Sequence, residues 1–127
     1  MNIEELKKEA KLLHYKKGEI IYETKEYLSD IQVYYILKGE VLLRKKYTPL
    51  VKDEFIIKEN NFFGVLEIYN SKIRLTDAEA LTDVELLGFD KITFERALIS
   101  NIQISLQIIR GLSSILRKAN ERIKNLP

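Results

Sequence analysis

The sequence contains no cysteine, a single histidine and no long apolar run. Without cysteine the chain has no disulfide, thiolate metal ligand or cysteine nucleophile, and this composition suits a cytoplasmic location. His14 lacks partners for a metal site or a catalytic triad, so we expect a structural or surface role for it. No apolar run approaches the roughly 20 residues of a membrane helix, and we expect neither a membrane anchor nor a signal peptide.

Common catalytic and nucleoside triphosphate-binding motifs are also absent from the sequence. The patterns Gly-x-x-x-x-Gly-Lys-Ser/Thr, His-Glu-x-x-His and Gly-x-Ser-x-Gly do not occur. A net charge of +2 is too small to indicate a nucleic-acid binder through its field alone. We therefore expect no enzyme activity, no catalytic residue, no metal site and no bound cofactor.

The length of 127 residues and the balance of 46% hydrophobic and 31% charged residues suit one globular domain over 1–127. Short runs rich in β-branched and aromatic residues alternate with turn residues over 14–90. Such spacing predicts a mainly β fold, a jelly roll or barrel of about eight strands with flanking helices. The clearest predicted strands cover 31–37, 41–47 and 51–57.

Helical patterns stand at both ends of the chain. Residues 2–13 place apolar side chains at helical spacing and predict an N-terminal helix with one apolar face: Ile3, Leu6, Ala10 and Leu13. Near the other end, Asp90 is a good N-cap for a helix over 91–99. The expected apolar residues of that helix are Ile92, Phe94 and Leu98.

A long helix is predicted after Ser100 or Asn101, either of which could cap it, and it extends to about Lys124, within C-terminal helices over 91–126. One apolar line has the alternating three- and four-residue spacing of a coiled coil: Leu106, Ile109, Leu112, Leu116, Ala119, Ile123 and Leu126. A second line lies on a neighbouring face: Ile104, Ile108 and Ile115. Two apolar lines need two surfaces, so we favour a homodimer, with burial of both lines in one domain as the alternative.

The stretch over 60–80 carries the best candidate for a binding site. It predicts a turn, about one turn of helix and a strand, with Gly64 after two aromatic residues and Arg74 ten residues later. The first amides of a helix have no intrahelical partner and attract anions, and an arginine fork matches phosphate oxygens. A turn glycine and a solvated arginine are the alternative interpretation.

This stretch resembles the phosphate-binding cassette of the cyclic nucleotide-binding domain, the module of catabolite activator proteins and of regulatory subunits of cAMP-dependent protein kinase. Phe63-Gly64, Arg74 and Ala80 match the family pattern, and Tyr34 to Val41 resembles its strand-turn-strand signature. The resemblance covers roughly residues 10–125. It implies a roll of β-strands with a cassette helix and a long C-terminal helix, similar to the double-stranded β-helix of cupins.

The cassette also departs from the family pattern. Val65 replaces the glutamate that holds the ribose 2′-hydroxyl, and Leu75 replaces a small residue. Asn60 replaces the first glycine, a position where asparagine tolerates left-handed backbone angles. The implied ligand-binding residues are Phe63, Gly64, Val65, Leu66, Arg74, Leu75, Thr76 and, on the long helix, Asn120.

Two functions of different classes follow. The first is a stand-alone regulatory sensor in which a cyclic nucleotide or other phosphate-bearing molecule pairs with Arg74 and shifts the C-terminal helix. The second is a degenerate dimerisation or protein-interaction module without a small ligand, in which Arg74 pairs with Glu67 or Glu79. The transcription factors of the family continue into a DNA-reading module, whereas this sequence ends at Pro127, so we expect no direct DNA binding.

Overall fold

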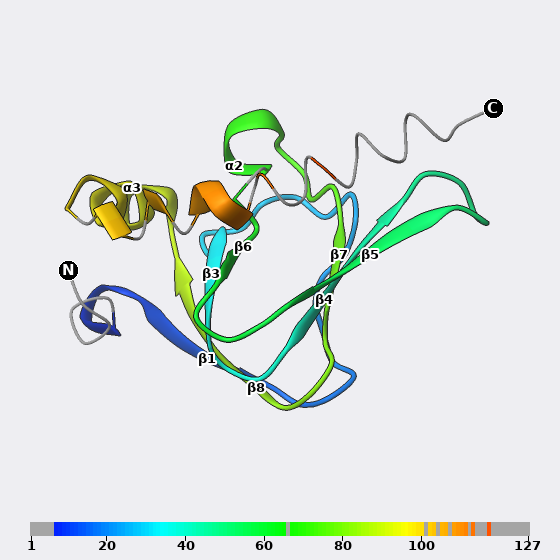
Figure 1. Cartoon of the computed structure of the whole chain (residues 1–127), viewed down its shortest axis with the longest axis horizontal. Helices are drawn as coiled ribbons and strands as arrows, with labels where there is room; N and C mark the ends of the chain where they lie inside the picture. The colour runs from blue at the N-terminus through cyan, green and yellow to red at the C-terminus, as the bar shows by residue number, and fades with distance from the viewer. Residues whose placement is uncertain are drawn as a thin grey trace.

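The structure, a computed structural model, describes residues 7–65, 67–100, 102, 103, 105, 106, 108–111, 113 and 117. Within these residues eight strands form two four-stranded antiparallel sheets (Figure 1). The predicted mainly β fold of about eight strands is confirmed, as two sheets rather than a closed barrel. One sheet has the order β1 (Lys11–Tyr15), β8 (Val84–Phe89), β3 (Val33–Lys38) and β6 (Phe62–Phe63). The other has the order β2 (Ile20–Tyr22), β7 (Asp77–Ala80), β4 (Val41–Lys46) and β5 (Lys52–Ile57).

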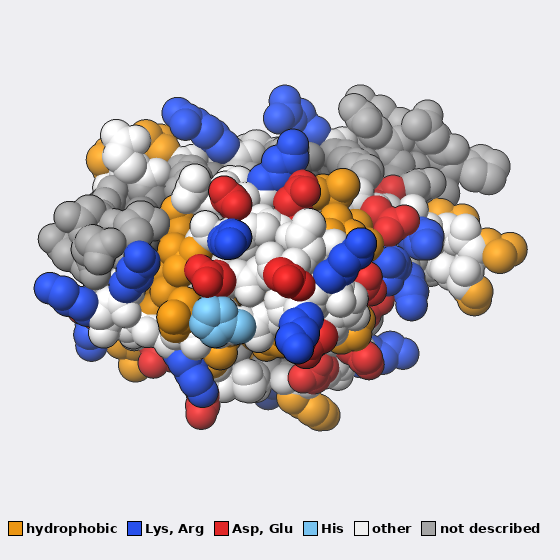
Figure 2. Space-filling model, turned by 90° about the horizontal axis from the view of Figure 1, so that it is seen from below, with side chains coloured by type: hydrophobic (Ala, Val, Ile, Leu, Met, Phe, Trp, Pro, Cys, Tyr) orange, Lys and Arg blue, Asp and Glu red, His pale blue; other side chains and the backbone are white. Residues whose placement is uncertain are grey.

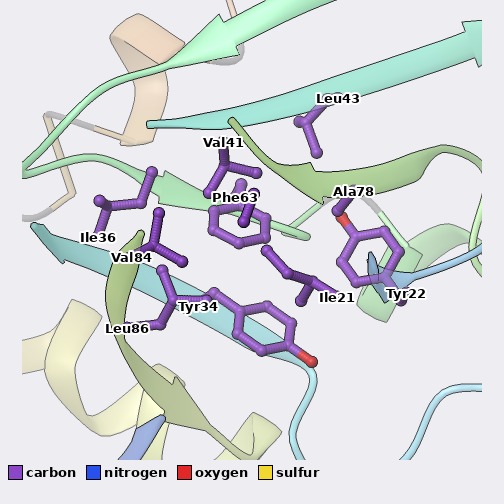
Figure 3. Close-up of a cluster of buried hydrophobic side chains, with 11 residues drawn as sticks. Ile21, Tyr22, Tyr34, Ile36, Val41, Leu43, Phe63, Ala78, Val84 and Leu86 are labelled. Atoms are coloured by element: carbon purple, nitrogen blue, oxygen red, sulfur yellow. The ribbon is translucent and has the colours of Figure 1, made fainter. Parts of the chain in front are cut away.

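Strands β3 and β8 divide the core into two clusters, because successive side chains of a strand point to opposite faces. The inter-sheet cluster, drawn in Figure 3, joins both sheets: Ile21, Tyr22, Tyr34, Ile36, Val41, Leu43, Phe63, Ala78, Ala80, Val84 and Leu86. The helix-side cluster takes the alternate residues of β3 and β8 together with helical residues: Val33, Tyr35, Val65, Ile68, Leu87, Phe89, Phe94, Ala97 and Ile108. One pair of strands therefore links the space between the sheets to the helices.

Two short helices cover the helix-side cluster, α2 (Glu67–Asn70) and α3 (Lys91–Ser100). Asp90 caps α3 as predicted, since its Oδ1 accepts the amide N–H of Thr93 at 2.7 Å. That hydrogen bond holds the pKa of the Asp90 carboxyl below its usual value. Phe94 and Ala97 are the buried residues of α3, whereas Ile92, predicted to face the core, is exposed on the opposite side of the helix.

Residues 7–9 are helical, in agreement with the N-terminal helix predicted over 2–13, but two details of the helix predictions are wrong. The helix predicted over 2–13 does not reach its end, because 11–13 belong to β1 and pair with β8, where backbone pairing overrides helical spacing. Its first part, 1–6, lies outside the described residues. Ser100 does not cap a following helix, since it is the last residue of α3 and its hydroxyl donates to the Arg96 carbonyl at 2.8 Å. Asn101, the alternative cap, lies outside the described residues. The described residues from 102 to 117 are helical.

The turn between β3 and β4 depends on Gly39, whose φ of +93° lies in the left-handed region. A Cβ there would meet the Asp83 carbonyl and lie 2.7 Å from Thr82 Oγ1. We predict that Gly39→Ala lowers the free energy of unfolding by roughly 2–4 kcal/mol, the sum of the left-handed penalty and overpacking. Urea unfolding followed by circular dichroism measures the loss.

Gly18→Ala is the matched control, because Gly18 also has a positive φ, +88°, but no atom within 4 Å of an added Cβ. This variant should lose only the backbone term of about 1–2 kcal/mol. Equal losses in the two variants would show that the turn over 82–83 yields to the new methyl group.

Candidate functional site

Arg74 lies in the connection between α2 and β7, three residues before the strand at whose start it was predicted. Its backbone is fixed on both sides by the loop that follows β2. The Arg74 N–H donates to the Glu26 carbonyl at 2.7 Å, and the Lys25 N–H donates to the Arg74 carbonyl at 2.8 Å. These two bonds direct the side chain inward, where only 2% of the residue is exposed.

The guanidinium of Arg74 contacts backbone carbonyls and an aromatic ring. It donates to the Gln32 carbonyl at 2.9 Å and, over longer distances, to the carbonyls of Ile31 at 3.4 Å and Gly64 at 3.5 Å. Its Cζ lies 4.1 Å from the centroid of the Tyr22 ring. In the described part of the chain Arg74 has no ion pair with a carboxylate. A buried cation without an ion pair is costly, and here backbone carbonyls and the Tyr22 ring offset part of that cost.

Gly64 allows this arrangement. Its φ is +84°, and a Cβ at this position would lie 2.9 Å from both Arg74 Nη1 and the Gln32 carbonyl oxygen. Any other residue would therefore push the guanidinium away. The preceding residue, Phe63, stacks on Tyr34 with centroids 5.0 Å apart and rings 10° from parallel, which fixes the start of the cassette against β3.

Asn60 opens the cassette with a φ of +66°, the left-handed conformation expected where the family has glycine. Its side chain contributes a further bond, because Oδ1 accepts the Tyr35 hydroxyl at 3.1 Å. The turn therefore survives the replacement of glycine.

The remaining predicted site residues do not all meet at Arg74. Val65 is buried in the helix-side cluster and contributes apolar contacts. Leu75 is engaged through its backbone, since its N–H donates to Glu67 Oε1 at 3.3 Å and its carbonyl accepts Lys45 Nζ at 3.3 Å. Thr76 is half-buried. Leu66 and Asn120 lie outside the described residues.

Two residues beside Arg74 were not predicted as ligand contacts. Glu67, considered only as an internal partner of Arg74, is 4% exposed and holds the Leu75 amide instead. Tyr22, on β2, is 3% exposed, and its hydroxyl interacts with the Thr76 side chain without forming a hydrogen bond of good geometry to the described residues. No local pattern in the sequence could have found Tyr22, because only the pairing of β2 with β7 brings it to Arg74.

The pKa of the Tyr22 hydroxyl lies well above its ordinary value. Burial raises the pKa of Tyr22 most, and the negative charge of Glu67 raises it further. The positive charge of Arg74 and the Thr76 side chain lower the pKa, without cancelling the increase. Tyr22 therefore stays protonated, with the Arg74 guanidinium over its ring.

A cavity of about 180 Å³ reaches Arg74 from the side of β1 and β2. Aromatic residues line much of it, among them Tyr15, Tyr22 and Tyr34, with Glu26 also on its wall. Burial raises the pKa of both Tyr15 and Tyr34, so these hydroxyls too remain protonated. The volume is below the roughly 300–1,000 Å³ typical of ligand pockets, so a nucleotide would need additional room.

The face drawn in Figure 2 shows no second candidate site among the described residues. Figure 2 shows a face on which lysine and arginine side chains alternate with acidic ones around the single histidine, without a patch of one sign. That residue, His14, is exposed and lies 3.9 Å from Glu85. No group of described residues has the composition of a metal site. No described helix combines the length and hydrophobicity that a membrane span requires.

Comparisons with known proteins agree with this geometry. A family model described as cyclic nucleotide-binding domain matches residues 12–101. The global nitrogen regulator of Nostoc sp. PCC 7120 is 36% identical over 98 residues, which cover 75% of this chain and 44% of that protein. The chain thus spans less than half the length of this curated relative.

Solved structures show the same fold. A transcriptional regulator from Thermotoga maritima superposes with a TM-score of 0.75 at 20% identity, over 97% of this chain and 95% of that one. The cAMP-bound structure of PfPKA-R superposes with a TM-score of 0.60 at 31% identity, over 69% of this chain and 31% of that one.

Asp77, at the start of β7, fastens the end of the cassette to the loop after β2. It accepts the N–H of Thr24 at 2.8 Å and its hydroxyl at 2.9 Å, and it lies 3.5 Å from Lys46 Nζ. Burial raises the pKa of Asp77, but the Thr24 hydrogen bonds and the Lys46 charge outweigh it and leave the pKa below 3.8. The ionised carboxylate therefore stabilises the fold above the unfolded-state pKa, and this contribution is lost as pH falls through the lower folded-state pKa.

We predict that Asp77→Asn lowers the free energy of unfolding at pH 7 by about 1–2 kcal/mol. The difference from wild type should persist down to about pH 4 and shrink below it, as Asp77 itself becomes protonated. Urea unfolding at several pH values between 7 and 2.5 measures it, with the exposed Asp30→Asn as a control that costs little. A difference independent of pH would contradict the assigned role of the charge.

Proposed function

Because the chain belongs to the cyclic nucleotide-binding domain family, we propose that it is a regulatory sensor domain that binds a cyclic nucleotide or another phosphate-bearing small molecule. The observation that supports this proposal most directly is the buried Arg74 guanidinium without a carboxylate partner. The similarity to a transcription regulator supports a regulatory rather than a catalytic role.

The contacts of Arg74 favour an anionic ligand. A guanidinium has five N–H donors. All three acceptors of the Arg74 guanidinium are backbone carbonyls, and two of these hydrogen bonds are long, at 3.4 and 3.5 Å. A phosphate would replace such long bonds with shorter charge-assisted ones and neutralise the buried charge. Arg74 is thus positioned as the ligand's anchor.

Ligand binding would also change the position of the helices packed against the cassette. The cavity beside Arg74 is smaller than a nucleotide pocket, so ligand entry requires the cassette to shift. Val65 and Ile68 of the cassette share the helix-side cluster with Phe94 and with Ile108 of the following helical segment. Because packed cores deform little, a shift of the cassette changes the position of that segment.

The same helical segment supports a homodimer. Ile108 is buried in the helix-side cluster, so the line it belongs to faces the domain. Three other residues of this segment are exposed at the three- and four-residue spacing of a coiled-coil seam: Ile102, Leu106 and Ile109. A second copy of this chain supplies a matching line, and we propose that ligand binding is signalled through this seam.

One observation favours the second function, a dimerisation or protein-interaction module without a small ligand. Glu67 occupies the Leu75 amide, a backbone donor close to Arg74, and its charge opposes an incoming anion. In this case Arg74 serves only to fasten the loop over 31–32 to Gly64. The two functions differ in whether any anion stabilises the folded protein.

We predict that millimolar cAMP, cGMP or a cyclic dinucleotide raises the thermal midpoint, since a ligand that binds only the folded state adds about 2.7 kcal/mol at a hundredfold excess over its Kd. Arg74→Ala should abolish the shift, and Arg74→Lys, which keeps the charge but loses the fork, should reduce it strongly. The exposed Arg96→Ala is the control and should retain it. The absence of a shift with every nucleotide would reject the sensor and favour the interaction module.

The double variant Ile102→Lys/Ile109→Lys should convert a wild-type dimer into a monomer, because it places four like charges in an apolar seam. Light scattering coupled to size-exclusion chromatography measures the mass. Ile56→Lys, on the exposed face of β5, is the control and should leave the dimer intact. A monomeric wild type at every concentration would refute the proposed seam.

A further inference from the structure

The cavity that reaches Arg74 has side chains of opposite charge on its wall, Arg74 and Glu26. Arg74 is 2% exposed, and Tyr22 and Tyr34 beside it are also buried, so these residues form the inner end of the cavity. Glu26 and Tyr27 come from the loop after β2 and are exposed, so they lie where the cavity opens to solvent. The cavity is therefore positive at its buried end and negative at its opening.

Arg74 and Glu26 are joined through their backbones, but their side chains do not pair. The Arg74 N–H donates to the Glu26 carbonyl at 2.7 Å. The guanidinium is directed to the Gln32 carbonyl at 2.9 Å, whereas Oε2 of the Glu26 carboxylate accepts the Glu23 N–H at 2.9 Å. No ion pair joins the two side chains in the described structure. Two opposite charges thus line one small cavity without contacting each other.

We infer that the ligand is a small zwitterion, a phosphate monoester that also carries an ammonium group. Its phosphate binds Arg74 at the inner end of the cavity, and its ammonium group binds the carboxylate of Glu26 at the opening. This inference rests on the proposed function, from which it takes Arg74 as the phosphate anchor, and it adds the chemical class of the ligand.

Size and connectivity narrow the class further. The cavity volume of about 180 Å³ is below that of a nucleotide pocket, but an aminoalkyl phosphate of about eight non-hydrogen atoms is much smaller than a nucleotide. Because Arg74 lies at the inner end, against the packed side chains of the inter-sheet cluster, the phosphate has to be the end of the molecule. A phosphodiester, such as a lipid headgroup, would need room beyond Arg74 for its second substituent.

The aromatic lining also favours an ammonium group at the opening. Tyr15 and Tyr27 line the cavity together with Glu26, and aromatic rings attract ammonium ions. Burial raises the pKa of Tyr15 most, and the charges of Glu19 and Glu26 raise it further, as expected for a hydroxyl that shares this cavity with a carboxylate. The Tyr15 hydroxyl therefore stays neutral, and Glu26 supplies the negative charge of the cavity wall.

Isothermal titration calorimetry with O-phosphoethanolamine and propyl phosphate tests the inference at about pH 8, where both phosphates are dianionic. The two molecules have the same shape, but propyl phosphate has a methyl group in place of the ammonium group. Wild type should bind O-phosphoethanolamine roughly fivefold more tightly, the upper end for an ion pair exposed to solvent. Glu26→Gln should bring this preference close to one, since it removes the charge and retains an oxygen for the Glu23 amide. Asp30→Asn, exposed in the same loop and outside the cavity wall, is the matched control and should keep the preference.

Three outcomes would overturn the inference. Equal binding of both phosphates by wild type would refute the ammonium contact and leave the sensor function intact. A preference unchanged in Glu26→Gln would refute the role of Glu26. Glycerophosphoethanolamine, a diester, should bind more weakly than O-phosphoethanolamine, and equal binding would identify a headgroup rather than a free monoester as the ligand. Binding of none of these phosphates and of no cyclic nucleotide would reject the proposed function as well.

Discussion

The buried charge of Arg74 is the constraint on which the arrangement of the site depends. Its guanidinium can stay inside only because carbonyls from two separate segments, 31–32 and Gly64, and the Tyr22 ring surround it. This requirement explains why position 64 has no side chain and why the loop after β2 pairs with the cassette backbone. In the described structure this charge forms no ion pair with a carboxylate, and backbone carbonyls are its hydrogen-bond acceptors.

The division of the core by β3 and β8 gives that site a mechanical connection to the rest of the molecule. Alternate residues of each strand face the Arg74 side or the helix side, so neither cluster can change its packing without the other. Ile68 of α2, in the cassette, and Ile108 of the helical segment after α3 are both buried in the helix-side cluster. Packed side chains therefore connect the surroundings of Arg74 with that helical segment.

Much of the fold follows from local patterns. Gly39 between two β-rich runs predicts the β3–β4 turn, because few residue types other than glycine adopt a positive φ. Asp90 predicts the start of α3, because few side chains can accept the free amides of a helix N-terminus. Local sequence patterns mispredict the structure where contacts with other elements determine the conformation or the burial of a residue. Residues 11–13 have helical spacing, yet pairing with β8 makes them a strand, and the exposure of Ile92 follows from which face of α3 meets the sheet.

The sequence by itself determined that 60–80 forms a cassette with a left-handed turn at Asn60, a glycine at 64 and an arginine at 74, since these depend on backbone conformation and short-range spacing. Only the tertiary structure decided that Arg74 is buried without a direct ion pair in the described residues, that Val65 faces the helices and that the Tyr22 ring lies against the guanidinium. The physical reason is that burial and electrostatic contact depend on the pairing of strands distant in sequence, here β2 with β7, which no local spacing encodes.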